Sequence, residues 1–335
     1  MKVRVAMSGG IDSGVSAALL KKQGFEVEGV FMRLFNSKES KESEKRARMI
    51  ARKLRIPFYV LNLKKEFRKK IFDYFLKEIK EGRTPNPCVV CNKEIKFGIL
   101  LKGVPGLLAT GHYARIEKTK KGRALLKAKD KEKDQSYFLW KLGQKELKRV
   151  VFPLSGFTKK QVKSLASKWK LPVKKDSESQ EICFVSGKLN DFLKNHLKVK
   201  PGEIQDEKGK VLGEHSGLHF YTIGQRKGIG LSGGPYYVIE KDLKSNVLRV
   251  SRNEKHLFRK ELLVKNLNWI SGLKPRLPFK CSVSIRYGQE PVPAVLKPAG
   301  SRIRVVFKKP LRAIAFGQSA VFYKGRELSG GGIIC

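Results

Sequence analysis

A glycine-containing loop and three cysteines are the features of this chain whose residue types and spacing could support chemistry. The loop, Ser8-Gly9-Gly10-Ile11-Asp12-Ser13, lies between an apolar stretch and a helical pattern. Its glycines let backbone N–H groups approach a phosphate, its serines add hydroxyl donors, and the helix N-terminus adds partial positive charge. The loop predicts a phosphate site, although it lacks the Walker lysine and a tight turn without a ligand would show the same spacing.

The cysteines are Cys88, Cys91, Cys183, Cys281 and Cys335. An odd number argues against a disulfide framework in a cytoplasmic chain, where thiols serve metal or redox chemistry or fill a core. Cys88 and Cys91 form a Cys-x-x-Cys pair, and Lys93 and Lys96 follow closely, which favours thiolates. Taken alone, Cys91 and Cys183 could equally be ordinary buried cysteines. We expect Cys281 to be a strand-core residue and Cys335 a tail residue.

The charge of the chain predicts a polyanionic partner. Lysine and arginine total 72 against 30 acidic residues, a net charge of +42. Nucleic acid is the natural partner of such a surface, because each phosphate contact releases a counterion. A host proteome that is simply rich in lysine is the alternative explanation. No apolar run is long enough to span a membrane and the apolar start is too short for a signal peptide, so we expect a cytoplasmic, monomeric protein without a membrane partner.

Alternating elements in the first half of the chain must position the loop and the cysteines. Apolar stretches at 2–7, 25–34, 58–63 and 107–110 predict strands, and the patterns at 15–22, 41–54 and 67–79 predict helices. This alternation predicts a parallel sheet with right-handed crossovers. Ligands bind at the carboxyl ends of such strands, where Ser8, Met32 and Gly111 fall. Residues 84–87 are expected to form a loop.

The sequence pattern changes after about residue 190. Stretches 236–239 and 247–250 predict a hairpin. Alternating stretches at 280–287, 292–296, 301–307 and 319–323 predict a small β-barrel. The expected fold is therefore α/β, with a Rossmann-like catalytic domain at 1–190, a small mostly β domain at 191–255 and a C-terminal β-barrel at 256–335.

The glycine loop resembles the pyrophosphatase loop (PP-loop) of the ATP pyrophosphatases, which split ATP into AMP and pyrophosphate to adenylate an oxygen. Six further blocks resemble the bacterial tRNA 2-thiouridylases (the MnmA/TrmU family), and they occur in order at 84–97, 109–114, 133–139, 179–184, 219–228 and 285–287. Six ordered blocks are far more specific than the loop alone. The resemblance implies adenylation of the C2 oxygen of a wobble uridine, followed by sulfur transfer to give 2-thiouridine.

The resemblance also implies roles for particular residues. Cys183 would carry a persulfide sulfur, and Cys91 would be the second thiol. ATP and Mg²⁺ are the implied cofactors, and Asp12 lies where magnesium and phosphate are managed. The implied nucleotide contacts are Ala6, Met7, Ser8, Gly9, Gly10, Ile11, Asp12, Ser13, Met32 and Gly111. The implied target-base contacts are Asn86, Pro87 and Cys88, and the implied tRNA contacts are His112, Asp134, Gln135, Ser136, Arg286, Tyr287 and Gln318.

The implied partners are the anticodon stem-loop of tRNAs that accept glutamate, glutamine or lysine, and an upstream sulfur donor. A wobble uridine is already unpaired, so drawing it into a pocket costs little. The segment Gln225-Arg226-Lys227-Gly228 could hold phosphate or shape the site when RNA binds.

Cys88 departs from the family pattern, because many members have aspartate there, and this puts a general-base role in doubt. Cys88, Cys91 and Cys183 could instead ligate a 4Fe–4S cluster that carries sulfide, so persulfide and cluster routes both remain open. For a zinc site, His112 is the only nearby fourth ligand. Other hypotheses are a different PP-loop enzyme, such as a lysidine synthetase or 4-thiouridine synthase, and a non-catalytic RNA-binding protein.

Overall fold

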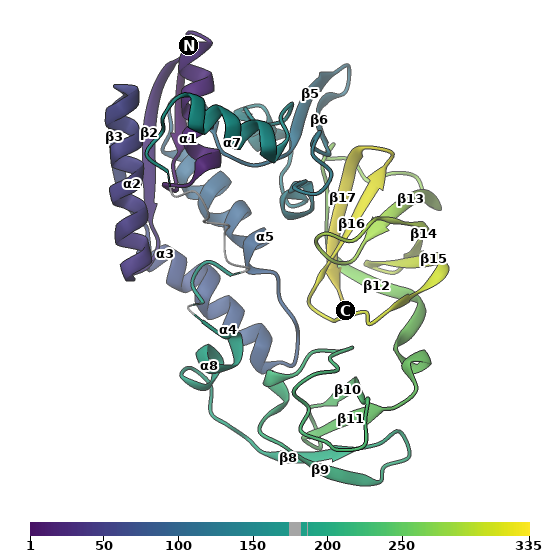
Figure 1. Ribbon diagram of the computed structural model, residues 1–335. Helices are drawn as coiled ribbons and strands as arrows, with labels where there is room; N and C mark the ends of the chain where they lie inside the picture. Colours follow the sequence, from purple (N-terminus) through teal and green to yellow (C-terminus); the bar gives the residue numbers. More distant parts are fainter. Residues whose placement is uncertain (174–181, 186) are drawn as a thin grey trace.

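The computed structural model describes residues 1–173, 182–185 and 187–335. Its first sheet has the strand order β3 (Phe58–Asn62), β2 (Glu26–Arg33), β1 (Lys2–Ala6), β4 (Leu107–Ala109) and β7 (Val150–Val151) (Figure 1). Every pairing in this sheet is parallel, as the alternation of elements predicts. The carboxyl ends of β1, β2 and β4 therefore meet at one edge.

Helices α1 (Ile11–Lys22), α2 (Lys38–Leu54) and α7 (Lys159–Lys168) accompany this sheet. Val3 and Val5 of β1 pack with Leu20 of α1 and Ile50 of α2 in one buried cluster. None of the helices in the described part of the chain is both long and apolar enough to cross a membrane.

The predicted long amphipathic helix consists of three consecutive segments, α3 (Lys64–Phe67), the π-helical η1 (Arg68–Phe72) and α4 (Asp73–Lys80). A second helical run follows, with α5 (Pro87–Cys91) and the π-helical η2 (Asn92–Leu100). The expectation that residues 84–87 form a loop is wrong at its end, because Pro87 is the first residue of α5. Asn86 caps this helix by accepting a hydrogen bond from the Val89 backbone N–H (3.3 Å).

The central region is a small sheet in the order β10 (Tyr237–Asp242), β11 (Val247–Ser251), β8 (Gly202–Gln205) and β9 (Val211–His215). The predicted hairpin is the antiparallel pair β10–β11. Short helical segments connect the larger elements: η3 (Ser136–Leu139), α6 (Gln144–Leu147), α8 (Leu189–Lys194), η4 (Leu218–Phe220) and η5 (Glu254–Leu257).

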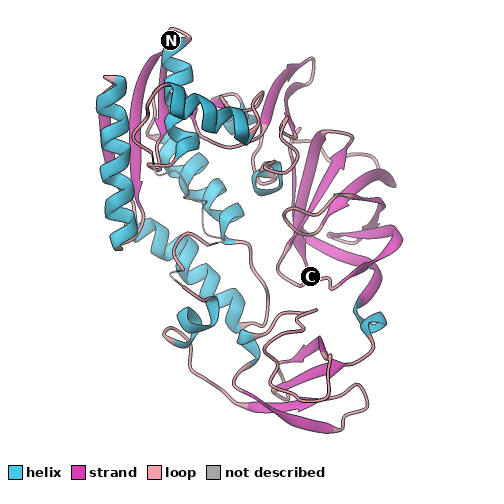
Figure 2. Cartoon of the chain, viewed as in Figure 1, coloured by secondary structure: helices cyan, strands magenta, loops and turns pink. Residues whose placement is uncertain are grey.

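Six strands form the C-terminal barrel, which Figure 2 shows as the all-strand end of the chain. Their order is β12 (Phe258–Trp269), β15 (Arg302–Arg312), β14 (Val292–Ala299), β13 (Phe279–Ser284), β16 (Ser319–Lys324) and β17 (Glu327–Ile334), and pairing of β12 with β17 closes the barrel. The predicted strand at 280–287 ends early, so Arg286 and Tyr287 lie in the turn after β13. Cys335 is no loose tail, because its N–H donates to the Leu263 carbonyl (3.0 Å).

The barrel shares its packing with the N-terminal region. The hairpin β5 (Arg115–Thr119) and β6 (Gly122–Leu126) extends the barrel sheet through pairing of β6 with β17. Trp140 is fully buried and its indole N–H donates to the Ser319 hydroxyl (2.9 Å). Asn268 of β12 donates to the Trp140 carbonyl (2.6 Å). One apolar cluster contains Trp140 together with Val321 and Leu328 of the barrel, so these two regions form a continuous core.

Candidate active site

The loop between β1 and α1 is already ordered by its own residues. The Ser13 hydroxyl accepts a hydrogen bond from the Ser8 N–H (3.1 Å) and donates to the Gly10 carbonyl (3.1 Å). Gly9 has a φ of +77°, and a Cβ there would lie 2.2 Å from the Ser43 carbonyl oxygen. Only glycine fits that position, which explains the tight turn before the helix N-terminus.

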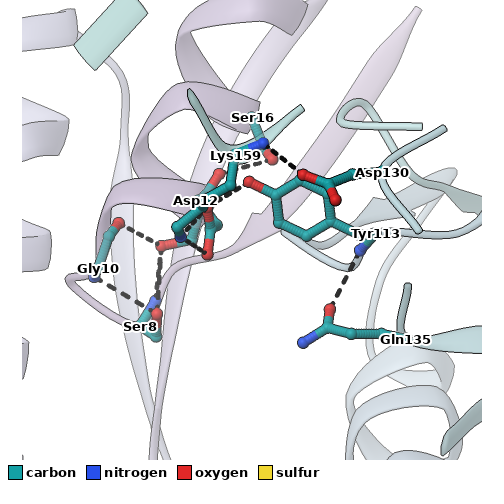
Figure 3. A network of polar contacts seen from close by, with 9 residues as sticks. Ser8, Gly10, Asp12, Ser16, Tyr113, Asp130, Gln135 and Lys159 are labelled. Carbon is teal, nitrogen blue, oxygen red and sulfur yellow. Dashed lines mark hydrogen bonds and ion pairs between the residues drawn. The ribbon is translucent and has the colours of Figure 1, made fainter. Parts of the chain in front are cut away.

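Asp12 lies at the centre of a polar network beside this loop (Figure 3). The Lys159 Nζ lies 2.6 Å from both of its carboxylate oxygens, and the Tyr113 hydroxyl donates to Oδ1 (2.8 Å). The Lys159 backbone N–H donates to the Asp130 carboxylate (2.8 Å) and so fixes the start of α7. Burial, followed by the Asp12 charge, raises the pKa of Tyr113, so its hydroxyl stays protonated and can donate.

Lys159 and Tyr113 are not among the residues predicted from sequence. The capping pattern of Thr158 and Gln161 indicates a helix start beside Lys159. Nothing local indicates that this helix start lies against Asp12, because that contact joins distant parts of the chain.

Gly111 follows β4 and lies directly against the nucleotide loop. A Cβ at this position would lie 2.9 Å from the Ser13 backbone nitrogen and 3.0 Å from Asp12. Met32 is half-buried near the carboxyl end of β2. The residues predicted to contact ATP, which are Ala6 to Ser13, Met32 and Gly111, therefore lie at one edge of the parallel sheet.

Cys91 and the residue after Cys183 pack in one apolar cluster. Cys91 ends α5, is 8% exposed, and packs with Phe67 and Ile71. Cys183 is exposed as a residue, and the adjacent Phe184 packs against the same cluster. The Phe184 ring centroid lies 5.6 Å from that of Phe67, and its contacts with Phe72 and Phe75 are 5.8 and 5.5 Å.

The thiols affect one another electrostatically. Burial raises the pKa of Cys91 to about 11, with Cys88 adding to the rise and Lys96 opposing it. The pKa of Cys183 is also raised, first by the protein atoms that desolvate its thiolate and then by Cys91 and Cys88. The direction of each shift shows that a charge on one of these thiols disfavours a charge on its neighbours. At neutral pH all three carry protons, and Lys96 is the cation that favours their thiolates.

His112 connects the thiols to the nucleotide loop. It follows Gly111, is 9% exposed, and its Nδ1 lies 2.7 Å from the Thr110 hydroxyl. Burial, followed by the charge of Lys96, lowers the pKa of His112 well below its usual value, so the imidazole is neutral. The positive charge of Lys96 therefore lowers the pKa of the thiols and also that of His112.

The predicted tRNA contacts at 134–136 are engaged with protein groups. The Ser136 hydroxyl donates to the Asp134 carboxylate (2.7 Å), and Asp134 also accepts from the Ala128 N–H (2.8 Å). Ser136 has no exposed surface, so tRNA could reach its side chain only if this segment opened. The Gln135 side-chain oxygen accepts from the Tyr113 N–H (3.1 Å), which places Gln135 beside the Asp12 network.

Arg286, Tyr287 and Gln318, which are also predicted tRNA contacts, lie in turns of the C-terminal barrel. Tyr287 is 45% exposed and contacts Phe138 in a tilted arrangement with ring centroids 4.5 Å apart. Gln318 donates its side-chain amide to the Thr84 carbonyl (3.0 Å), and the Thr84 N–H donates to the Phe316 carbonyl (2.8 Å). The barrel turn at 316–318 thus holds the segment that leads to Asn86, Pro87 and Cys88. Arg286 is exposed and donates to the Ala313 carbonyl.

The donor groups suit ATP better than a metal cluster. Backbone N–H groups, two hydroxyls and Lys159 surround the turn at 8–13, as a phosphate requires. Within the described ranges no set of three or more His, Cys, Asp or Glu side chains has the geometry of a metal site.

Three family models cover the chain. They are described as the tRNA methyl transferase HUP domain at residues 1–187, the tRNA methyl transferase PRC-barrel domain at 190–252 and the aminomethyltransferase beta-barrel domain at 259–334.

Curated relatives match over nearly the whole chain. The chain is 44% identical to the tRNA-specific 2-thiouridylase MnmA of Carboxydothermus hydrogenoformans, over 99% of this chain and 97% of that protein. It is 45% identical to MnmA 2 of Thermoanaerobacter sp., with the same coverage. MnmA of Syntrophomonas wolfei is 44% identical over the full length of both chains.

Proposed function

Because this chain belongs to the family of tRNA-specific 2-thiouridylases, we propose that it adenylates the C2 oxygen of the wobble uridine with ATP and then replaces that oxygen with sulfur. The protein is an ATP-using tRNA sulfurtransferase. The packing of Cys91 and of Phe184, the neighbour of Cys183, in one apolar cluster is the observation that supports this chemistry best. We also propose that the sulfur is transferred to the tRNAs that accept glutamate, glutamine and lysine.

The loop at 8–13 binds the pyrophosphate portion of ATP through its backbone N–H groups. Asp12 is the carboxylate suited to hold Mg²⁺, which would neutralise phosphate charge when bound. Lys159 lies where it can pass from Asp12 to a phosphate oxygen as charge develops during adenylation. AMP on the C2 oxygen turns a poor electrophile into one with a good leaving group.

Sulfur transfer then uses the two thiols in sequence. The outer sulfur of a Cys183 persulfide attacks C2, and AMP departs with the former C2 oxygen. The Cys91 thiolate attacks the Cys183 sulfur, which forms a Cys91–Cys183 disulfide and releases the new thiocarbonyl. An external thiol must reduce this disulfide before the next turnover. The two cysteines therefore have distinct roles.

Cys88 is proposed to contact the target base without acting as a general base. Burial raises its pKa, so it is a neutral thiol at physiological pH and differs from the aspartate of many relatives. Asn86 and Pro87 lie beside it at the start of α5. His112, Gln135 and Tyr287 are the tRNA contacts that this arrangement favours.

The test combines nucleoside mass spectrometry with pyrophosphate release, using unmodified tRNA, ATP, Mg²⁺ and a persulfide donor. Cys183→Ser and Cys91→Ser should each abolish 2-thiouridine while tRNA-dependent pyrophosphate release continues. Normal thiolation by either variant would refute its assigned role. Pyrophosphate release that is absent even with tRNA would instead indicate a pure RNA binder, and a lysine adduct or 4-thiouridine would indicate another PP-loop enzyme.

A further inference from the structure

A basic hollow lies on α3 and η1, and the reaction on tRNA gives it no role. Its volume is about 600 Å³, and Asp73 contributes to its lining. Its other lining residues, Lys64, Lys65, Arg68 and Lys69, are called here the α3–η1 basic face. Lys65, Arg68 and Lys69 are exposed to solvent, and Lys64 is half-buried.

Most of the charge on this face is not neutralised by the protein. Arg68 lies 3.9 Å from the Asp73 carboxylate, with both side chains largely exposed. Among the residues that the structure describes, no carboxylate forms an ion pair with Lys64, Lys65 or Lys69. The face is therefore a local source of positive potential that an acidic partner would neutralise.

The opposite side of the same helix holds the segment that carries Cys183. Phe67 and Ile71 are buried in the cluster against which Phe184 packs. Phe72 contacts Phe184 (5.8 Å), and the Arg68 guanidinium lies over the Phe72 ring (5.5 Å). The basic face and the segment that carries Cys183 thus belong to one continuous piece of structure.

The two thiols of the site differ in access. Cys183 is exposed, whereas Cys91 is buried. Figure 1 shows α3 on the side of α5 that is turned away from the barrel, where Tyr287 and Gln318 lie. A protein could therefore approach Cys183 from the α3 side without competing with RNA for the barrel side.

We propose that the α3–η1 basic face is the docking surface for an acidic protein that carries a cysteine persulfide and loads Cys183 with sulfur. This inference rests on the proposed function. In the loading step the Cys183 thiolate attacks the outer sulfur of the donor persulfide. The donor S–S bond breaks, the donor leaves as a thiolate, and the sulfane sulfur keeps its oxidation state, so no further oxidant or reductant is needed.

RNA is the competing occupant of any basic surface on this chain. Phe72 and Phe184 join the face to the segment that carries Cys183, and this favours a protein donor, because a persulfide must come within bonding distance of Cys183 and RNA carries none. Complementary charge mainly raises the rate of encounter, and salt weakens this effect.

The probes are two synthetic peptides that each carry a cysteine persulfide, one flanked by glutamates and one by lysines. Persulfidation of Cys183 in the full-length protein is followed by mass spectrometry at low and high salt. The acidic peptide should load Cys183 about tenfold faster at low salt, and this advantage should shrink as salt rises.

The variant Lys64→Glu/Lys65→Glu/Lys69→Glu should lose this advantage. The matched control Lys118→Glu/Lys120→Glu/Lys121→Glu changes the same charge on the exposed β5–β6 turn and should keep it. Both variants should retain wild-type tRNA affinity and tRNA-dependent pyrophosphate release. Inorganic polysulfide should load Cys183 equally in all three proteins, which would show that the thiol and the fold are intact.

Equal loading by both peptides, or an unchanged advantage in the α3–η1 variant, would overturn the proposal. A variant that loses tRNA affinity but loads normally would show that RNA occupies this face, and would overturn it as well. Failure of the proposed function would look different, because Cys183 would load as expected while no 2-thiouridine formed.

Discussion

The nucleotide loop is held by bonds among its own residues, whereas Cys183 is held through Phe184 by residues far away in the sequence. Ser8, Gly10 and Ser13 bond to one another before any ligand is present. Phe184 depends on rings from α3, η1 and α4. The phosphate site is therefore preformed, and the thiol segment can change position without disturbing it. Adenylation and sulfur transfer should consequently be separable by mutation.

The largest expected effect comes from a substitution next to the nucleotide loop. Lys159→Ala removes a cation and leaves the Asp12 carboxylate free to repel the triphosphate, so tRNA-dependent pyrophosphate release should fall about 100-fold. Peptide-persulfide loading of Cys183 should be unchanged. Lys160→Ala, an exposed neighbour on α7, serves as the control. Normal adenylation by Lys159→Ala would contradict the assignment of Lys159 to the nucleotide site.

Phe184→Ala tests the thiol side. It removes contacts with four aromatic rings, each worth about 0.5–1.5 kcal/mol, so 2-thiouridine formation should fall about tenfold while pyrophosphate release stays normal. Phe258→Ala, at an exposed site on the barrel, is the matched control. If both activities fell together, the two regions would not be independent.

The pH dependence of alkylation tests whether burial sets the reactivity of Cys91. Burial raises the pKa of Cys91 to about 11, so below that pH its thiolate fraction grows about tenfold per unit. Between pH 9 and 10 alkylation of Cys91 in the folded protein should rise about ninefold, as read by peptide mass spectrometry. The urea-unfolded chain, with an ordinary thiol pKa, should rise less than about twofold over the same interval. Equal slopes would mean that burial does not set the reactivity of Cys91.

Gln318→Ala should have the smallest effect. It removes one hydrogen bond to the segment before α5, worth about 1 kcal/mol, so thiolation should fall about fivefold and tRNA affinity less. Gln23→Ala, at an exposed site, is the control. A larger loss of tRNA affinity than of turnover would show that Gln318 contacts RNA directly.

Local patterns were enough to predict the parallel sheet and the nucleotide loop. Alternating strands and helices define such a sheet, and the loop from Ser8 to Ser13 is built within a few residues. The pairing of Asp12 with Lys159 could not be predicted, because it requires knowing where α7 packs. The pairing of Cys91 with Cys183 is implied by family resemblance and not by their spacing, and it stays a prediction.

The barrel shows where sequence patterns mislead. Strands β12 and β17 were not predicted, and Gly330 to Gly332 of β17 look like strand breakers. These glycines are needed because neighbours leave no room for a side chain: a Cβ on Gly331 would lie 3.0 Å from Trp140. The predicted strand through Tyr287 ended early, at Ser284, before the turn that contains Gly288 with a φ of +75°.

The burial of Trp140 between two regions limits how this protein can be shortened. A fragment that ended near residue 190 would expose Trp140 to water and leave its indole N–H without Ser319. It would also leave β6 as an unprotected sheet edge, which invites aggregation. The catalytic half therefore depends on the barrel for its packing. Any design that moves its activity into another protein would have to include the barrel.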